Sequence, residues 1–98
     1  MTEKLKRVRG SSNVFRDLGF GKAEAESLKL RAELMMRIDG FHRLSGLTQA
    51  EAAKVLGLTQ PRLNALLKGK IDLFSLDALV DVAARAGLNV RLVVKKAA

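Results

Sequence analysis

The amino-acid sequence predicts a mostly α-helical bundle of about five helices that ends in one β-strand. Three observations support this fold class. Apolar residues recur every three or four positions over residues 23–42, helix-capping residues bound three later segments, and residues 88–95 alternate and are rich in valine. Because 98 residues suffice for one modest core, we expect residues 13–98 to form a single domain.

The composition excludes several kinds of protein. There is no cysteine, so disulfides, thiolate metal sites and thiol catalysis are excluded. No apolar run approaches the ~18 residues of a membrane-spanning helix, and no apolar stretch follows the basic N-terminus as it would in a secretory signal. We therefore expect a cytoplasmic protein that makes no membrane contact.

The formal net charge of +8 is unevenly distributed along the chain. Residues 1–10 contain four basic residues and one acidic residue, and residues 41–70 contain five basic residues and one acidic residue. We interpret residues 1–12 as a flexible, basic N-terminal arm. Positive charge in these two segments suits the phosphate backbone of a nucleic acid, but ribosomal and membrane-surface proteins share such a charge.

Two helices are predicted in the first half of the domain. Apolar residues at helical spacing predict a short helical turn over residues 13–20. Residues 23–42 predict an amphipathic helix of about five turns. Its apolar stripe consists of Leu28, Ala32, Met35, Ile38 and Phe41. Gly40 is a weak point at which the regular helix can end.

Residues 47–69 read LTQAEAAKVLGLTQPRLNALLKG and predict two short helices joined by a tight turn. Thr48, with Glu51 three residues later, forms a capping box that starts the first helix. This helix is expected to run to Leu56, after which Gly57 supplies a left-handed stop.

The second short helix is expected to begin at a Thr59 cap and to end near Lys68. Pro61 falls in its first turn, where the missing N–H would have had no partner. A third capped helix is predicted over residues 75–86 and is closed by Gly87.

Apolar residues of the two short helices are predicted to face each other. They are Ala52, Ala53, Val55 and Leu56 in the first helix, and Leu63, Leu66 and Leu67 in the second. Small alanines let the helices cross closely, as in a helix-turn-helix. The second helix then projects its N-terminal turn outward, where it can enter the major groove of double-stranded DNA.

The exposed side chains of this second helix are the candidates for reading bases. The exposed residues are predicted to be Gln60, Pro61, Arg62, Asn64 and Ala65, and all but Ala65, which offers only a methyl group, are candidate readers. Glutamine matches adenine and arginine matches guanine, each through two hydrogen bonds. The candidates for the DNA backbone are the residues at both helix starts and the lysines past the far end. They are Thr48, Gln49, Thr59, Lys68 and Lys70.

On these residues, positions 44–79 resemble the Cro/repressor-type (XRE) helix-turn-helix family. The shared pattern consists of Thr48-Gln49, Ala52-Ala53, Gly57, Thr59-Gln60 and Gly69-Lys70. The resemblance implies a lambda-repressor-like bundle in which Gln49 grips a phosphate and Gln60 opens the base-reading turn. The chain departs from the better-known repressors at Pro61 and Ala65, which narrows direct readout to Gln60, Arg62 and Asn64.

A wider resemblance joins residues 11–20, the long helix, Pro61-Arg62 and residues 74–77. Together these are similar to a subgroup of small XRE regulators that includes HigA-like antitoxins. The resemblance implies an autorepressing antitoxin of a type II toxin-antitoxin pair, with a small RNA-cleaving toxin as partner. A stand-alone XRE-type repressor and a general RNA-binding or structural basic module stay open as alternatives.

Residues 88–95 are predicted to form the C-terminal strand, which needs a partner for its backbone hydrogen bonds. The partner is either the basic arm or the same strand of a second copy. In the second case Val90, Leu92 and Val94 would join a homodimer on a pseudo-palindromic operator.

No catalytic or metal site is predicted. His42 is the only histidine and has no companion at ligand spacing. Ser11-Ser12 has no nearby histidine to activate a nucleophile. We therefore expect no enzyme activity and no cofactor.

Overall fold

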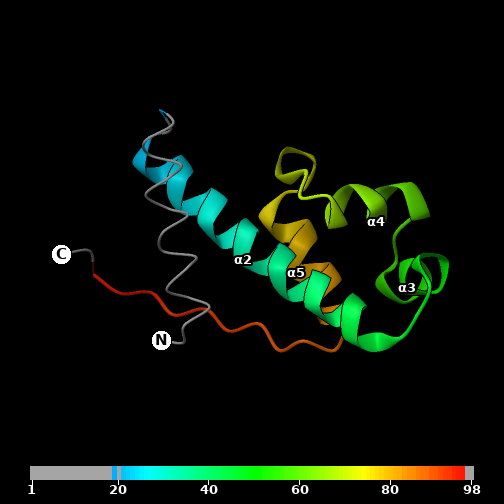
Figure 1. The fold of residues 1–98 in the computed structure, drawn as a ribbon. Coiled ribbons are helices and arrows are strands. Elements are labelled where there is room, and N and C mark those ends of the chain that lie inside the picture. The colour runs from blue at the N-terminus through cyan, green and yellow to red at the C-terminus, as the bar shows by residue number, and fades with distance from the viewer. Residues whose placement is uncertain (1–18, 20, 97–98) are drawn as a thin grey trace.

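The computed structural model describes residue 19 and residues 21–96. Within these residues it contains four α-helices and one 3-10 turn. In chain order they are α2 (Lys22–Ser45), α3 (Gln49–Leu56), α4 (Gln60–Leu67), η1 (Ile71–Leu73) and α5 (Leu76–Arg85). Helices α3 and α4 lie at one end of the long helix α2, and α5 packs along α2 (Figure 1). None of the described helices is long and apolar enough to cross a membrane.

Helix α2 is longer than predicted because it continues through Gly40 and ends only at Gly46, which has a φ of 74°. Glycine inside a helix costs about 1 kcal/mol relative to alanine. Here Ile38 is fully buried just before Gly40, and an ion pair of 2.8 Å between Asp39 and Arg43 spans it. These contacts outweigh the low helix propensity of glycine.

The predicted caps of the three short helices are confirmed. The Thr48 hydroxyl oxygen accepts the Glu51 N–H at 3.1 Å, and the Glu51 carboxylate accepts the Thr48 N–H at 2.9 Å. Thr59 accepts the N–H of Arg62 at the start of α4. Ser75 accepts the N–H of Ala78 in the same way at the start of α5.

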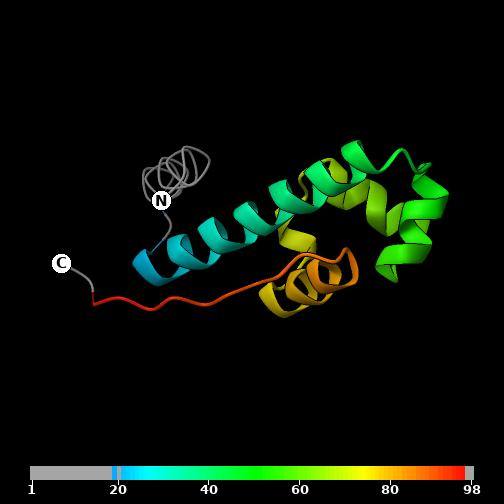
Figure 2. The same ribbon diagram turned by 90° about the horizontal axis from the view of Figure 1, so that it is seen from below.

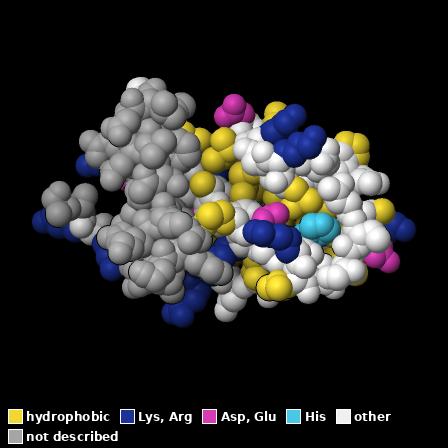
Figure 3. Space-filling view, viewed as in Figure 1, with side chains coloured by type: hydrophobic (Ala, Val, Ile, Leu, Met, Phe, Trp, Pro, Cys, Tyr) yellow, Lys and Arg dark blue, Asp and Glu magenta, His cyan; other side chains and the backbone are white. Residues whose placement is uncertain are grey.

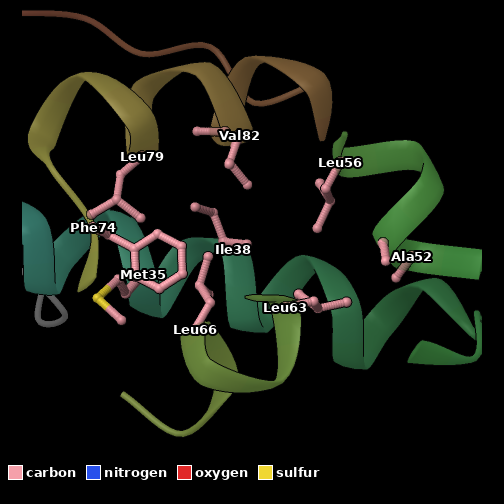
Figure 4. Close-up of a cluster of buried hydrophobic side chains, with 11 residues drawn as sticks. Met35, Ile38, Ala52, Leu56, Leu63, Leu66, Phe74, Leu79 and Val82 are labelled. Carbon is pink, nitrogen blue, oxygen red and sulfur yellow. The ribbon is translucent and has the colours of Figure 1, made fainter. Parts of the chain in front are cut away.

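The core lies where α2, α3, α4 and α5 meet (Figure 4). Its buried members are Met35, Ile38, Ala52, Ala53, Leu56, Leu63, Leu66, Phe74, Leu79, Val82 and Ala83. Val55 was predicted to join them, but 46% of it is exposed. It lies about 100° around α3 from the centre of the face formed by Ala52, Ala53 and Leu56, so it points outward.

The predicted C-terminal strand is wrong for the described chain, in which residues 88–96 form neither helix nor strand. The N–H of Leu88 still reaches the carbonyl oxygen of Ala83 at 3.0 Å, and beyond it the chain runs back past α2 (Figure 2). A strand must pair its N–H and C=O groups with a neighbouring strand, and the described residues offer none. The first predicted helix, over residues 13–20, and the arm lie outside the described residues apart from Gly19, which is in a turn.

Candidate nucleic-acid interface

Helices α3 and α4 pack directly on each other, joined by a tight turn at Gly57. Ala52 and Ala53 are buried at this contact and have no bulk to hold the helices apart. Leu63 and Leu66 anchor α4 to the rest of the core. These contacts confirm the predicted helix-turn-helix and leave the outer side of α4 open to solvent.

A shallow hollow of about 370 Å³ lies on this outer side and is lined by Gln49, Gln60, Pro61 and Asn64. It brings three of the predicted base-reading residues together with Gln49, which we predicted to contact the backbone. Gln60 and Pro61 are exposed, while Gln49 and Asn64 are half-buried. Three side-chain amides thus meet at one surface, and each provides both donors and an acceptor for base edges or phosphates.

Arg62 is not part of this hollow. Its guanidinium lies over the ring of Phe74, 4.4 Å from the ring centroid. At about 100° per residue, Arg62 is about 200° around the helix from Gln60, whereas Asn64 is only about 40° from Gln60. The structure therefore separates the predicted arginine reader from the predicted amide readers.

The predicted backbone-contacting residues occupy both ends of α4 and the start of α3. Thr48 and Thr59 are exposed caps whose oxygens each accept one N–H, which leaves their hydroxyl protons free to donate. Lys68 and Lys70 are exposed at the far end of α4. Basic side chains also stand out at the loop between α4 and α5 in Figure 3.

One residue of this region was missed by the sequence reasoning. Arg31 of α2 donates a hydrogen bond of 3.3 Å to the carbonyl oxygen of Phe74, although the two residues are 43 positions apart. The helical pattern of α2 identified its apolar stripe only. A contact across this distance in sequence left no local signal.

Residues 14–95 match the model of a family described as a helix-turn-helix domain. The chain belongs to this helix-turn-helix domain family. The match covers most of the chain and includes both helices of the motif and the loop to α5. No curated protein matches the chain. Family membership agrees with the observed packing of α3 on α4 and supports DNA binding by the domain.

Proposed function

We propose that this helix-turn-helix protein is a sequence-specific transcriptional repressor of the XRE type that binds operator DNA. The observation that carries the proposal is the amide-lined hollow of Gln49, Gln60, Pro61 and Asn64 on the open side of α4. A major groove about 12 Å wide admits one α-helix. With α4 in the groove, this hollow faces the base edges.

Gln60 and Asn64 are the residues best placed to read bases, because they lie one turn apart on the same side of α4. Each amide matches adenine through its N6 and N7 atoms. Pro61 lies between them and offers only apolar contact, which suits a thymine methyl group. Thr48, Gln49, Thr59, Lys68 and Lys70 remain the proposed contacts to the sugar-phosphate backbone.

We further propose that the repressor acts as a homodimer joined through its C-terminal segment. Val90, Leu92 and Val94 are 42%, 82% and 82% exposed, a high exposure for a row of apolar side chains. The segment begins at Leu88, which lines a groove of about 500 Å³ together with Met36, Gly40 and Leu44. Met36, Leu44 and Leu88 contribute apolar surface to this groove, which a second copy would cover. Two recognition helices would then meet half-sites about 34 Å apart.

An antitoxin role is the proposed biological setting of this repressor. It rests on the resemblance of residues 11–20, Pro61-Arg62 and residues 74–77 to HigA-like antitoxins. The expected partner is a small RNA-cleaving toxin encoded beside this gene. If the product of an adjacent small basic reading frame does not co-purify with the repressor, the stand-alone alternative is favoured.

The DNA-reading proposal is tested by selecting a preferred duplex from a random library and measuring affinity by gel shift. We expect Gln60→Ala and Asn64→Ala each to lower the preference for the selected duplex over random duplex by about 1–3 kcal/mol. Asn89→Ala removes an exposed amide outside the motif and should leave the preference unchanged. Equal binding of single strands and duplex would instead support the general nucleic-acid module.

A further inference from the structure

Two arginines from different helices converge on Phe74. The Arg62 guanidinium from α4 lies over the ring, with its Cζ atom 4.4 Å from the centroid. The Arg31 guanidinium from α2 donates to the carbonyl oxygen of the same residue at 3.3 Å. Because Phe74 itself is buried, with only 1% exposed, it provides a rigid platform for both cations. We call these three residues the Arg31–Phe74–Arg62 cluster.

Neither arginine of the cluster has an acidic partner within the described part of the chain. The other helical arginines that pair do so with an acid four residues earlier. They are Arg37 with Glu33, Arg43 with Asp39, and Arg85 with Asp81. The residue four positions before Arg31 is Ser27, and before Arg62 it is Leu58. Among the described residues the cluster therefore keeps its positive charge uncompensated, in contrast to these three paired arginines.

Hydrogen-bond donors in the cluster are also unused. The Nε atom of Arg31 is buried and has no hydrogen-bond partner. The Arg62 guanidinium contacts Phe74 through its π face, which leaves its N–H groups free at the edge of the plane. The buried Nε itself lies out of reach of an anion, but the exposed Arg62 guanidinium and the half-buried Arg31 guanidinium carry charge that a bound anion would neutralise.

Arg62 lies about 40° around α4 from the buried Leu66 and about 100° from the exposed Pro61, so the cluster lies on the flank of α4 between its core side and the hollow. Phe74 ends the loop that follows α4, and the exposed Lys68 and Lys70 belong to the same loop region. When a recognition helix lies in the major groove, its flanks face the sugar-phosphate walls. The anion nearest to this flank would be a phosphate group of the duplex.

We propose that the Arg31–Phe74–Arg62 cluster binds one phosphate group of the DNA backbone. This inference rests on the proposed function, because it requires α4 in the major groove. Arg62 is then a phosphate-contacting residue and not a base reader, and Phe74 holds its guanidinium in place. Arg31 adds a second cation to the same phosphate.

The experiment measures binding of the full chain to the selected duplex and to random duplex over a range of salt concentrations. One phosphate contact contributes about 0.9 to the slope of log K against log salt, so its loss removes roughly an eightfold change in affinity for each tenfold change in salt. We expect Arg62→Gln and Arg31→Gln each to weaken binding to the selected and to the random duplex by a similar factor. Each should also reduce the salt slope by up to about 1. The slope of the variant that carries both substitutions should fall by no more than about 1, because both arginines contact one phosphate.

Three controls separate this role from its alternatives. Arg62→Lys keeps the charge and should retain most of the slope, even if loss of the planar contact lowers stability. Arg85→Gln removes a paired arginine and should leave the slope unchanged. The third control compares inhibition of DNA binding by inorganic phosphate with inhibition by chloride at equal ionic strength. The extra inhibition by phosphate should be no larger for the unaltered protein than for Arg62→Gln. A larger extra inhibition of the unaltered protein would identify a site for free phosphate instead.

The outcomes also separate this inference from the proposed function. If Arg62→Gln changes the preference between duplexes while the slope stays constant, Arg62 reads a base and the inference is wrong. A loss of slope of about 2 in the double variant would show two independent phosphate contacts and would also overturn it. If Gln60→Ala and Asn64→Ala leave the preference unchanged, the base-reading proposal fails whatever Arg62 does.

Discussion

Replacing Gly57 by alanine tests how the turn of the helix-turn-helix is joined to α5. Gly57 ends α3 with a φ of 70°, and its N–H reaches the carbonyl oxygens of Ala53 and Lys54. A Cβ atom at this position would lie 3.0 Å from Nη1 and 3.1 Å from Cδ and Cζ of Arg85. The substitution therefore imposes a backbone cost and a steric cost at once.

The two costs differ in size. The left-handed conformation costs an L-residue about 1–2 kcal/mol. About 0.4–1 kcal/mol of this is offset because alanine reduces the entropy of the unfolded chain. Moving Arg85 aside sacrifices its exposed ion pair of 3.0 Å with Asp81, a kind of pair worth about 0.3–0.5 kcal/mol in a helix. Together these terms lower the free energy of unfolding of Gly57→Ala by about 1 kcal/mol, within a range of about 0.3–2 kcal/mol.

Gly46→Ala is the matched control, because Gly46 has a φ of 74° and open space around its Cβ position. Urea unfolding followed by far-UV circular dichroism measures the loss of unfolding free energy in each variant. The loss should be about 0.5 kcal/mol smaller for Gly46→Ala than for Gly57→Ala. In an Arg85→Ala background the two losses should become equal. If the excess cost of Gly57→Ala persists without the Arg85 side chain, the steric part of the reasoning is refuted.

Two further predictions concern the start of α3 and the proposed dimer. Thr48→Ala should lower the free energy of unfolding by about 1–2 kcal/mol, because it removes the acceptor for the Glu51 N–H, while Thr48→Ser should cost only a few tenths in the same urea assay. Leu92→Asp should convert dimer to monomer in sedimentation. Its unfolding midpoint should match that of the unaltered protein only at concentrations where the latter is also monomeric, because this side chain is 82% exposed in the single chain and dimerisation stabilises the folded state. Asn89→Asp adds the same charge nearby; if it dissociates the dimer equally, Leu92 is not a contact.

The boundaries of the short helices could be predicted from the sequence because their signals are local. A capping box needs only Thr48 and Glu51 at the right spacing, and a left-handed stop needs only a glycine such as Gly57. Both features act within one turn of helix, so neither depends on how the rest of the chain packs. The same locality explains why Gln60, Pro61 and Arg62 were identified correctly as exposed, whereas Asn64 and Ala65, also predicted to be exposed, are half-buried.

Other features depended on contacts that the local pattern does not contain. The continuation of α2 through Gly40 is explained by burial of Ile38 and by the Asp39–Arg43 pair, which outweigh propensity. The valine-rich C-terminal segment has the composition of a strand, but a strand requires a second strand to pair with. The position of Arg62 was missed because its partner ring, Phe74, arrives only after the chain has turned through η1.

The division of α4 into two sides has a consequence for specificity. Gln60, Pro61 and Asn64, which face the hollow, are all uncharged, whereas the arginine of α4 lies on the flank. The two proposed amide readers, at about 1–3 kcal/mol each, would give about 2–6 kcal/mol of discrimination per copy. Specific operator binding typically exceeds non-specific binding by about 4–10 kcal/mol. The discrimination by one copy reaches only the lower part of that range, whereas the discrimination by two copies would span it. A small number of base readers therefore favours a dimer.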